Sequence, residues 1–81
     1  MIVKVLYFAA AQELASRKSE DVEVPEGDSV GQLATRILRA HPALMAISRS
    51  VRFSVNLVVA SEDTRLRDGD QVGVLPPVAG G

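Results

Sequence analysis

Cysteine is absent from the 81 residues, and aromatic residues make up only 4% of them. Because there is no thiol, disulfides, thiolate metal sites and cysteine catalysis are excluded, and the chain fits a reducing compartment. Nine basic and ten acidic side chains leave a net charge of -1, so the sequence lacks the positive charge that attracts nucleic acid or an anionic membrane. No apolar run approaches the length of a membrane span, and the first strand-like run follows Met1 directly. We therefore expect a complete, cytosolic chain that binds neither nucleic acid nor membrane.

The chain does contain enough apolar surface for one small domain. Apolar residues make up 47% of the sequence and charged residues 23%, which is typical of a globular protein. With so few aromatic residues, the core is expected to consist of Val, Leu, Ile and Ala. A chain of this length has room for one core. We predict a single domain over residues 1–81, in which residues 76–81 form an extended C-terminal tail.

Alternation of apolar and polar side chains predicts five strands. They cover residues 2–8, 21–24, 51–55, 57–60 and 71–75. In the first strand Val3, Val5 and Tyr7 share the inner face, whereas Lys4, Leu6 and Phe8 share the outer one. In the last strand Val72 and Val74 point inward, and Leu75 points outward. The sequence therefore predicts an exposed apolar patch beside the root of the tail, formed by Leu6, Phe8, Val59 and Leu75.

One clear helix begins after Ser29, whose side chain can form a capping box with Gln32. Its apolar stripe comprises Val30, Leu33, Ala34, Ile37 and Leu38, and Pro42 ends it near His41. Residues 9–15, in which Ala10 and Leu14 lie one turn apart, favour a short helix or turn. Residues 43–50 are interpreted as an irregular turn packed under the sheet. This order predicts an α+β protein with the β-grasp fold, in which a mixed sheet of about five strands packs on one main helix.

The side chains offer little catalytic chemistry. His41 is the only histidine, and its place at a helix end before a proline favours a capping or solvated role. The acid pairs at residues 62–63 and 68–70 flank turn signals, so we interpret them as solvated loop acids. Glycines 27, 31, 69 and 73 lack the spacing of a phosphate-binding loop. The remaining reactive group is the terminal carboxylate of Gly81.

The C-terminus has the features of an arm that reaches into another protein. Two prolines after Leu75 hold the chain extended and remove two backbone donors. The final glycines carry no side chain, so they can enter a narrow slot, and the last four residues span roughly 13 Å when extended. The residues predicted to insert are Pro76, Pro77, Val78, Ala79 and Gly80, with Gly81 at the reactive end.

The β-grasp pattern, the Asp68-Gly69-Asp70 turn and the ending from Pro76 to Gly81 resemble the MoaD family, the small subunits of molybdopterin synthase. The resemblance covers the whole chain. The sequence departs from the family pattern at Leu75, where an aromatic residue is frequent, and at Asn56-Leu57, where a glycine is common.

This resemblance implies a sulfur carrier that binds no cofactor or metal and is not an enzyme on its own. An E1-like enzyme would use ATP to adenylate Gly81, and sulfur would replace AMP to give a terminal thiocarboxylate. The large synthase subunit would bind the tail and the patch formed by Leu6, Phe8, Val59 and Leu75, in a heterotetramer of two small and two large subunits. There the carrier would donate sulfur to a cyclic pterin phosphate to form the dithiolene.

Other classes of protein share some of these features. A thiamine-pathway sulfur carrier or a ubiquitin-like modifier has the same fold and terminal glycines, although thiamine carriers are typically shorter and lack the Pro-Pro-Val approach. A β-grasp interaction domain without terminal chemistry is the third alternative. Conversion of the terminus to a thiocarboxylate distinguishes carriers from such a domain.

Overall fold

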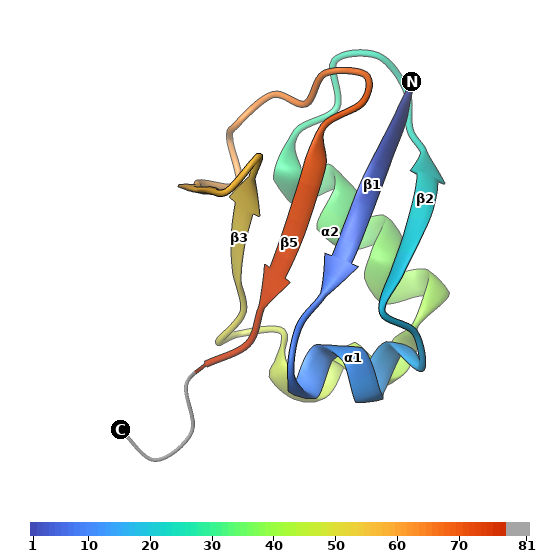
Figure 1. The fold of residues 1–81 in the computed structure, drawn as a ribbon, viewed down its shortest axis with the longest axis vertical. Helices are drawn as coiled ribbons and strands as arrows, with labels where there is room; N and C mark the ends of the chain where they lie inside the picture. The colour runs from blue at the N-terminus through green and yellow to red at the C-terminus, as the bar shows by residue number, and fades with distance from the viewer. Residues whose placement is uncertain (78–81) are drawn as a thin grey trace.

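The computed structural model describes residues 1–77 and contains five strands, two α-helices and one 3-10 helix (Figure 1). In chain order these elements are β1 (Ile2–Tyr7), α1 (Ala10–Ala15), β2 (Ser19–Glu23), α2 (Val30–Ala40), the 3-10 helix η1 (Pro42–Ile47), β3 (Arg52–Val55), β4 (Val58–Ala60) and β5 (Gln71–Leu75). Predictions about Val78, Ala79, Gly80 and Gly81 concern residues outside this described part.

The five strands form one mixed sheet in the order β2-β1-β5-β3-β4. β1 pairs with β2 antiparallel and with β5 parallel, and β3 pairs antiparallel with both β5 and β4. Helix α2 crosses behind the sheet in Figure 1. The predicted β-grasp fold is therefore confirmed. Because β5 lies at the centre of the sheet, the chain leaves the fold from a central strand.

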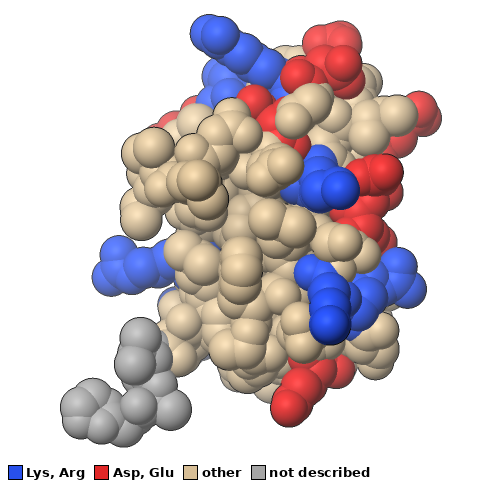
Figure 2. All heavy atoms as spheres, in the orientation of Figure 1, with Lys and Arg blue, Asp and Glu red and all other residues tan. Residues whose placement is uncertain are grey.

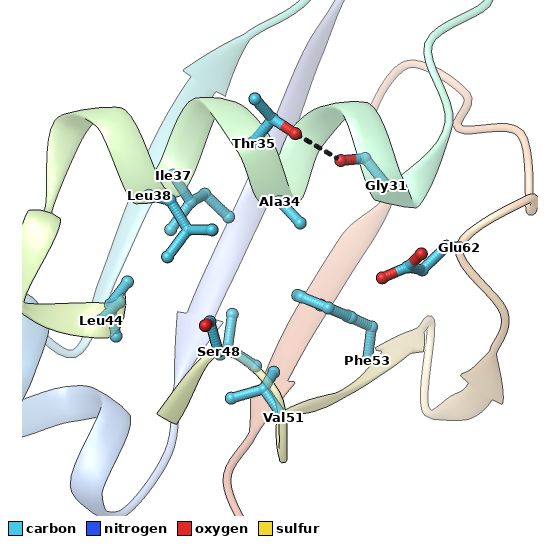
Figure 3. A pocket seen from close by; sticks show the side chains of 11 residues that line it. Gly31, Ala34, Thr35, Ile37, Leu38, Leu44, Ser48, Val51, Phe53 and Glu62 are labelled. Carbon is cyan, nitrogen blue, oxygen red and sulfur yellow. Dashed lines mark hydrogen bonds between the residues drawn. The ribbon is translucent and has the colours of Figure 1, made fainter. Parts of the chain in front are cut away.

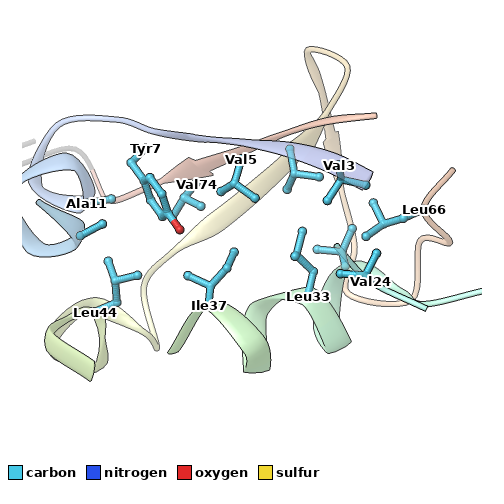
Figure 4. Close-up of a cluster of buried hydrophobic side chains, with 13 residues drawn as sticks. Val3, Val5, Tyr7, Ala11, Val24, Leu33, Ile37, Leu44, Leu66 and Val74 are labelled. Atoms are coloured by element: carbon cyan, nitrogen blue, oxygen red, sulfur yellow. The ribbon is translucent and has the colours of Figure 1, made fainter. Parts of the chain in front are cut away.

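The hydrophobic core lies between this sheet and α2 (Figure 4). As the alternation predicted, β1 buries Val3, Val5 and Tyr7. From α2 come Val30, Leu33 and Ile37, whereas Ala34 and Leu38 of the predicted stripe are only partly buried. The other buried hydrophobic residues are Ala11, Ala15, Val24, Leu44, Leu66, Val72 and Val74. The core contains one aromatic side chain, so aliphatic burial supplies most of the hydrophobic stabilisation.

The capping box that was predicted for α2 is present. The Ser29 backbone N–H donates to Gln32 Oε1 at 2.8 Å, and the Gln32 backbone N–H donates to Ser29 Oγ at 3.3 Å. The helix ends at Ala40, and the N–H of the C-cap residue His41 donates to Ile37 O at 2.8 Å. These bonds satisfy backbone groups that a helix end leaves without partners.

Of two short segments, one differs from its prediction and one agrees with it. Residues 43–47 are not an irregular turn, because Pro42 begins the 3-10 helix η1, which buries Leu44 and packs against α1 and α2, whereas residues 48–50 do form a turn. Proline is favoured in the first turn of a helix, because the backbone N–H groups of that turn have no acceptor within the helix and the absence of one costs no hydrogen bond. The short helix expected in residues 9–15 is confirmed as α1, which buries Ala11 and Ala15 and leaves Ala10 exposed.

Four strands differ from their predicted bounds, and the differences in β2 and β4 have clear structural causes. β2 begins at Ser19, two residues before the prediction, since Leu6 pairs with Ser19 and continues the ladder. Leu57 was placed in the fourth strand but lies in the hairpin turn with Asn56. Their φ angles are 74° and 50° respectively. A two-residue hairpin loop with positive φ at both positions matches the twist of the strands that it joins. Leu57 therefore lies in the turn and not in β4.

Candidate functional site

The sheet face turned away from α2 carries a row of residues from four neighbouring strands. The register pairs Leu6 in β1 with Gly73 in β5, Gly73 with Ser54 in β3, and Ser54 with Val59 in β4. Directly paired residues project to the same face of a sheet. Leu6 and Gly73 alternate with the inward-facing Val5 and Val72, so the row lies on the outer face.

Phe8 and Leu75 lie beside this row, over Gly73. A Cβ at Gly73 would stand 3.2 Å from Phe8 Cε2 and 3.8 Å from Leu75 Cδ2. The exposed fractions are 44% for Phe8 and 65% for Val59, and Leu6 and Leu75 are partly buried. The structure thus places on one face the four residues that were selected from the sequence, Leu6, Phe8, Val59 and Leu75, with Val59 separated from the other three by Ser54; these four are called the outer patch below.

Charge surrounds the outer patch rather than crossing it. Figure 2 shows this face in the orientation of Figure 1, with uncharged atoms over much of its middle and both acidic and basic side chains along the border where β2 lies. Asp21 and Glu23 of β2 pair with Lys4 and Ile2 and so belong to that border. An apolar area with a charged rim is typical of a surface that binds another protein.

The root of the tail lies at one end of the outer patch. β5 ends at Leu75, which is paired with Arg52 of β3, and Pro76 and Pro77 follow directly. Gly81 and the other predicted insertion residues beyond Pro77 lie outside the described residues. Their roles in the site therefore remain predictions.

Comparison with known proteins identifies the family. The ThiS family matches residues 5–81. The molybdopterin synthase sulfur carrier subunit of Mycobacterium tuberculosis is 40% identical over 80 residues, which cover 98% of this chain and 96% of that protein. The chain belongs to the ThiS family.

Among solved structures, a Pyrococcus furiosus protein assigned as molybdopterin converting factor subunit 1 is 37% identical, with a TM-score of 0.87 over 96% of this chain and 99% of that one. SAMP1 from Haloferax volcanii, a small archaeal modifier protein, is 26% identical, with a TM-score of 0.88 over the whole of both chains.

This ThiS-family chain also contains a polar cluster that sequence reasoning missed. Glu20 Oε2 accepts a hydrogen bond from Tyr7 Oη at 2.5 Å and lies 2.6 Å from His41 Nε2. Arg17 donates to Glu20 Oε1 at 3.1 Å, and the Tyr7 and His41 rings pack edge to face. His41 is the C-cap of α2, which confirms the capping alternative, but its side chain is only 12% exposed and so is not solvated. The available signal was Glu20 itself, since alternation places it on the inner face with Val22.

The electrostatics of this cluster favour an ionised Glu20. Burial by itself raises the pKa of the Glu20 carboxyl, but the hydrogen bonds from Tyr7 and His41 and the charges of His41 and Arg17 outweigh it and lower that pKa. The pKa of the Tyr7 phenol is raised, mainly by burial and further by the hydrogen bond to Glu20 and by the negative charge of Glu20. Tyr7 therefore remains a donor to the carboxylate, and the cluster joins β1 and β2 to the end of α2.

The pH dependence of stability tests this role. A carboxyl with a lowered folded pKa stabilises the fold above its unfolded pKa of about 4.3 and loses that contribution as the pH falls through the folded value. We expect Glu20→Gln to reduce the free energy of unfolding near pH 7, and this reduction to shrink as the pH falls below the unfolded pKa. Urea unfolding across this range measures it. Glu23→Gln, which changes an exposed carboxylate of the same strand, is the control, and a Glu20→Gln deficit that stays constant with pH would contradict the assignment.

The acids around the last turn have structural roles. Asp68 Oδ1 accepts from the Ile2 backbone N–H at 2.8 Å. Asp70 accepts from Asn56 Nδ2 at 2.9 Å and from the Arg67 backbone N–H at 2.8 Å. These two carboxylates fix the turn before β5. Asp68 is exposed, as expected of a solvated loop acid, whereas Asp70 is partly buried. Within residues 1–77, no group of three or more acidic or histidine side chains is placed to hold a metal, and no helix is long and apolar enough to cross a membrane.

A pocket of about 210 Å³ lies on the other side of the sheet, between α2 and β3 (Figure 3). Its walls are mainly apolar side chains such as Leu38, Val51 and Phe53, with Glu62 at one side. Thr35 Oγ1 donates to Gly31 O at 3.2 Å and is not aimed at a ligand. The pocket lining contains no nucleophile and base in contact, and it lies on the face opposite the outer patch.

Proposed function

We propose that this chain carries sulfur as a thiocarboxylate on Gly81 and delivers it to the large subunit of molybdopterin synthase. The full-length similarity to molybdopterin synthase sulfur carrier subunits is the observation that carries the proposal. The sequence supports it by ending in two glycines behind a proline pair. The same proposal places the chain in the cytoplasm.

The chemistry requires an activating partner. A terminal carboxylate has a pKa of about 3.5, so at neutral pH it is ionised and a poor electrophile. An E1-like enzyme would join the Gly81 carboxylate to the AMP portion of ATP and release pyrophosphate. A sulfide equivalent then forms a carbon–sulfur bond at the carbonyl carbon, and the bond from that carbon to AMP breaks. The thiocarboxylate passes its sulfur to a cyclic pterin phosphate, and two carriers are consumed for each dithiolene.

The described residues support the role of a substrate and subunit rather than that of a catalyst. His41 is engaged with Glu20, and Asp68 and Asp70 hold a turn. The residues that bind ATP and the pterin would therefore belong to the partners. We propose that two such chains and two large subunits form the synthase, with each tail inserted into a large subunit.

The outer patch is the proposed docking surface for both partners in turn. We expect Phe8→Ala and Leu75→Ala each to weaken binding to the large subunit by about 1 to 3 kcal/mol, because partly exposed apolar anchors dominate interfaces. The melting temperature should change little, since neither side chain belongs to the buried core. Calorimetric titration and thermal unfolding measure the two effects. A large loss of stability with unchanged affinity would assign both residues to the fold instead.

Mass spectrometry after incubation with an activating enzyme, ATP and a sulfur donor tests the proposed function. A carrier should gain the mass difference between sulfur and oxygen, and the reaction without ATP should leave the mass unchanged. A modifier would instead appear joined to lysine side chains of other proteins. An unchanged chain in the complete reaction would favour a β-grasp interaction domain.

A further inference from the structure

The hairpin between β3 and β4 is unusual because it exposes three consecutive apolar side chains. The exposed fractions are 91% for Leu57, 69% for Val58 and 65% for Val59. Val59 belongs to the outer patch, whereas Val58 pairs with Val55 and therefore points to the opposite face. Val72, which pairs with Val55 on that face, is fully buried. The core thus does not extend to β4, and the apolar surface passes around the edge of the sheet.

The two edges of the sheet are protected differently. At one edge, β2 contains Glu20, Asp21 and Glu23, and charge on an edge strand discourages pairing with another chain. At the other edge, β4 has the sequence Val-Val-Ala and no charge. This edge is therefore the one suited to contact with another protein.

The backbone at Leu57 gives an independent reason to assign a function to the hairpin. Among residues 1–77, four residues other than glycine have positive φ. Ala9 and Ser16 cap α1, and Asn56 donates to Asp70 and accepts from the Gln71 backbone N–H. Leu57, at φ 74°, has a branched side chain in a region that favours glycine, and that side chain is almost wholly exposed. A strained residue whose side chain adds no burial is a candidate for binding.

We propose that Leu57 and Val58 extend the outer patch around the β4 edge, and that the large subunit of molybdopterin synthase contacts both faces of this hairpin with an uncharged, apolar cleft. The inference rests on the proposed docking function. Its support is continuity, since Val59 shares the patch row with Leu6 and Ser54, whereas Leu57 and Val58 follow it directly around the edge. The absence of charge from residues 53–60 favours an apolar cleft over an acidic or basic one.

Leu57→Gly is the sharpest test because binding and stability should change in opposite directions. Glycine relieves the positive φ, so the melting temperature of the free chain should rise by about 2 to 4 °C. Affinity for the purified large subunit of molybdopterin synthase should fall about tenfold, as expected when an interface anchor is removed. Val58→Thr keeps the β-branched shape that suits a strand and should weaken binding about fivefold without changing the melting temperature. Lys18→Ala, which changes an exposed residue before β2 at the other edge, is the control and should leave affinity unchanged.

The outcomes separate this inference from the proposed function. If Phe8→Ala weakens binding while Leu57→Gly and Val58→Thr do not, the hairpin contact is wrong and the docking patch stands. If none of the three weakens binding, the docking surface itself is wrong, and thiocarboxylate formation still tests the carrier role separately. If the free chain sediments as a dimer that Leu57→Gly dissociates, the occupant of the edge is a second copy and the inference is overturned.

Discussion

Removing Gly81, or adding one residue after it, should abolish sulfur transfer and leave the fold intact. The proposed reactive group is the carboxylate at the end of the chain, so a shorter chain ends at the wrong distance, and a longer one presents an ordinary amide at that position. The buried hydrophobic residues of the described part end at Val74. Terminal residues beyond a core contribute little to folding, and the melting temperature should therefore be unchanged.

Two measurements check this prediction. Mass spectrometry after reaction with the activating enzyme reports thiocarboxylate formation, and a coupled assay with the large subunit reports transfer to the pterin. Thermal unfolding of the same samples is the control for the fold. Normal transfer by a chain that ends in an additional, non-cleavable residue would show that the terminal carboxylate is not the carrier group.

Gly80→Ala should depress adenylation or sulfur transfer severely, again with an unchanged melting curve. In the proposed mechanism, Gly80 enters a narrow channel just ahead of the reacting carbonyl, where a methyl group meets the wall and part of the backbone freedom of glycine is lost. A displacement of about 1 Å at a reacting centre can cost on the order of a hundredfold in rate. Complex formation should weaken only modestly, because the outer patch still docks.

Ala79→Gly is the matched control for this prediction. It adds backbone freedom one residue earlier and adds no bulk. The rates of adenylation and sulfur transfer in single-turnover assays should therefore change little. If Gly80→Ala reacted at the normal rate while Ala79→Gly was impaired, the stiffness of the tail would be the controlling property rather than the width of the channel.

The parts of the fold that the sequence predicted are those with a repeating local signal. Alternation in residues 2–8 identified Val3, Val5 and Tyr7 as buried, and the Ser29–Gln32 spacing located the start of α2. The outer patch could also be anticipated, because the same alternation assigns Leu6 and Leu75 to the outer face. Their mutual position needed the strand register, which only the structure supplies.

The parts that could not be predicted depend on contacts between distant residues. Tyr7, Glu20 and His41 come from three elements, and no local pattern indicates that one carboxylate will contact the other two side chains. Leu57 has a strong preference for strands or helices over left-handed turns, so its place in the hairpin is imposed by the pairing of β3 with β4. In both cases tertiary structure overrides local preference.

If the tail enters a partner, as proposed above, the central position of β5 has a mechanical consequence. β5 is hydrogen-bonded along both edges, to β1 on one side and β3 on the other, and Pro76 and Pro77 continue from its end. Tension on the tail acts along the axis of β5. It therefore shears the hydrogen bonds to β1 and to β3 together, and pulling β5 out would require many of these bonds to break at the same time. An edge strand pulled sideways would open one bond at a time. The carrier can therefore be held and released by its last residues while the outer patch keeps its shape.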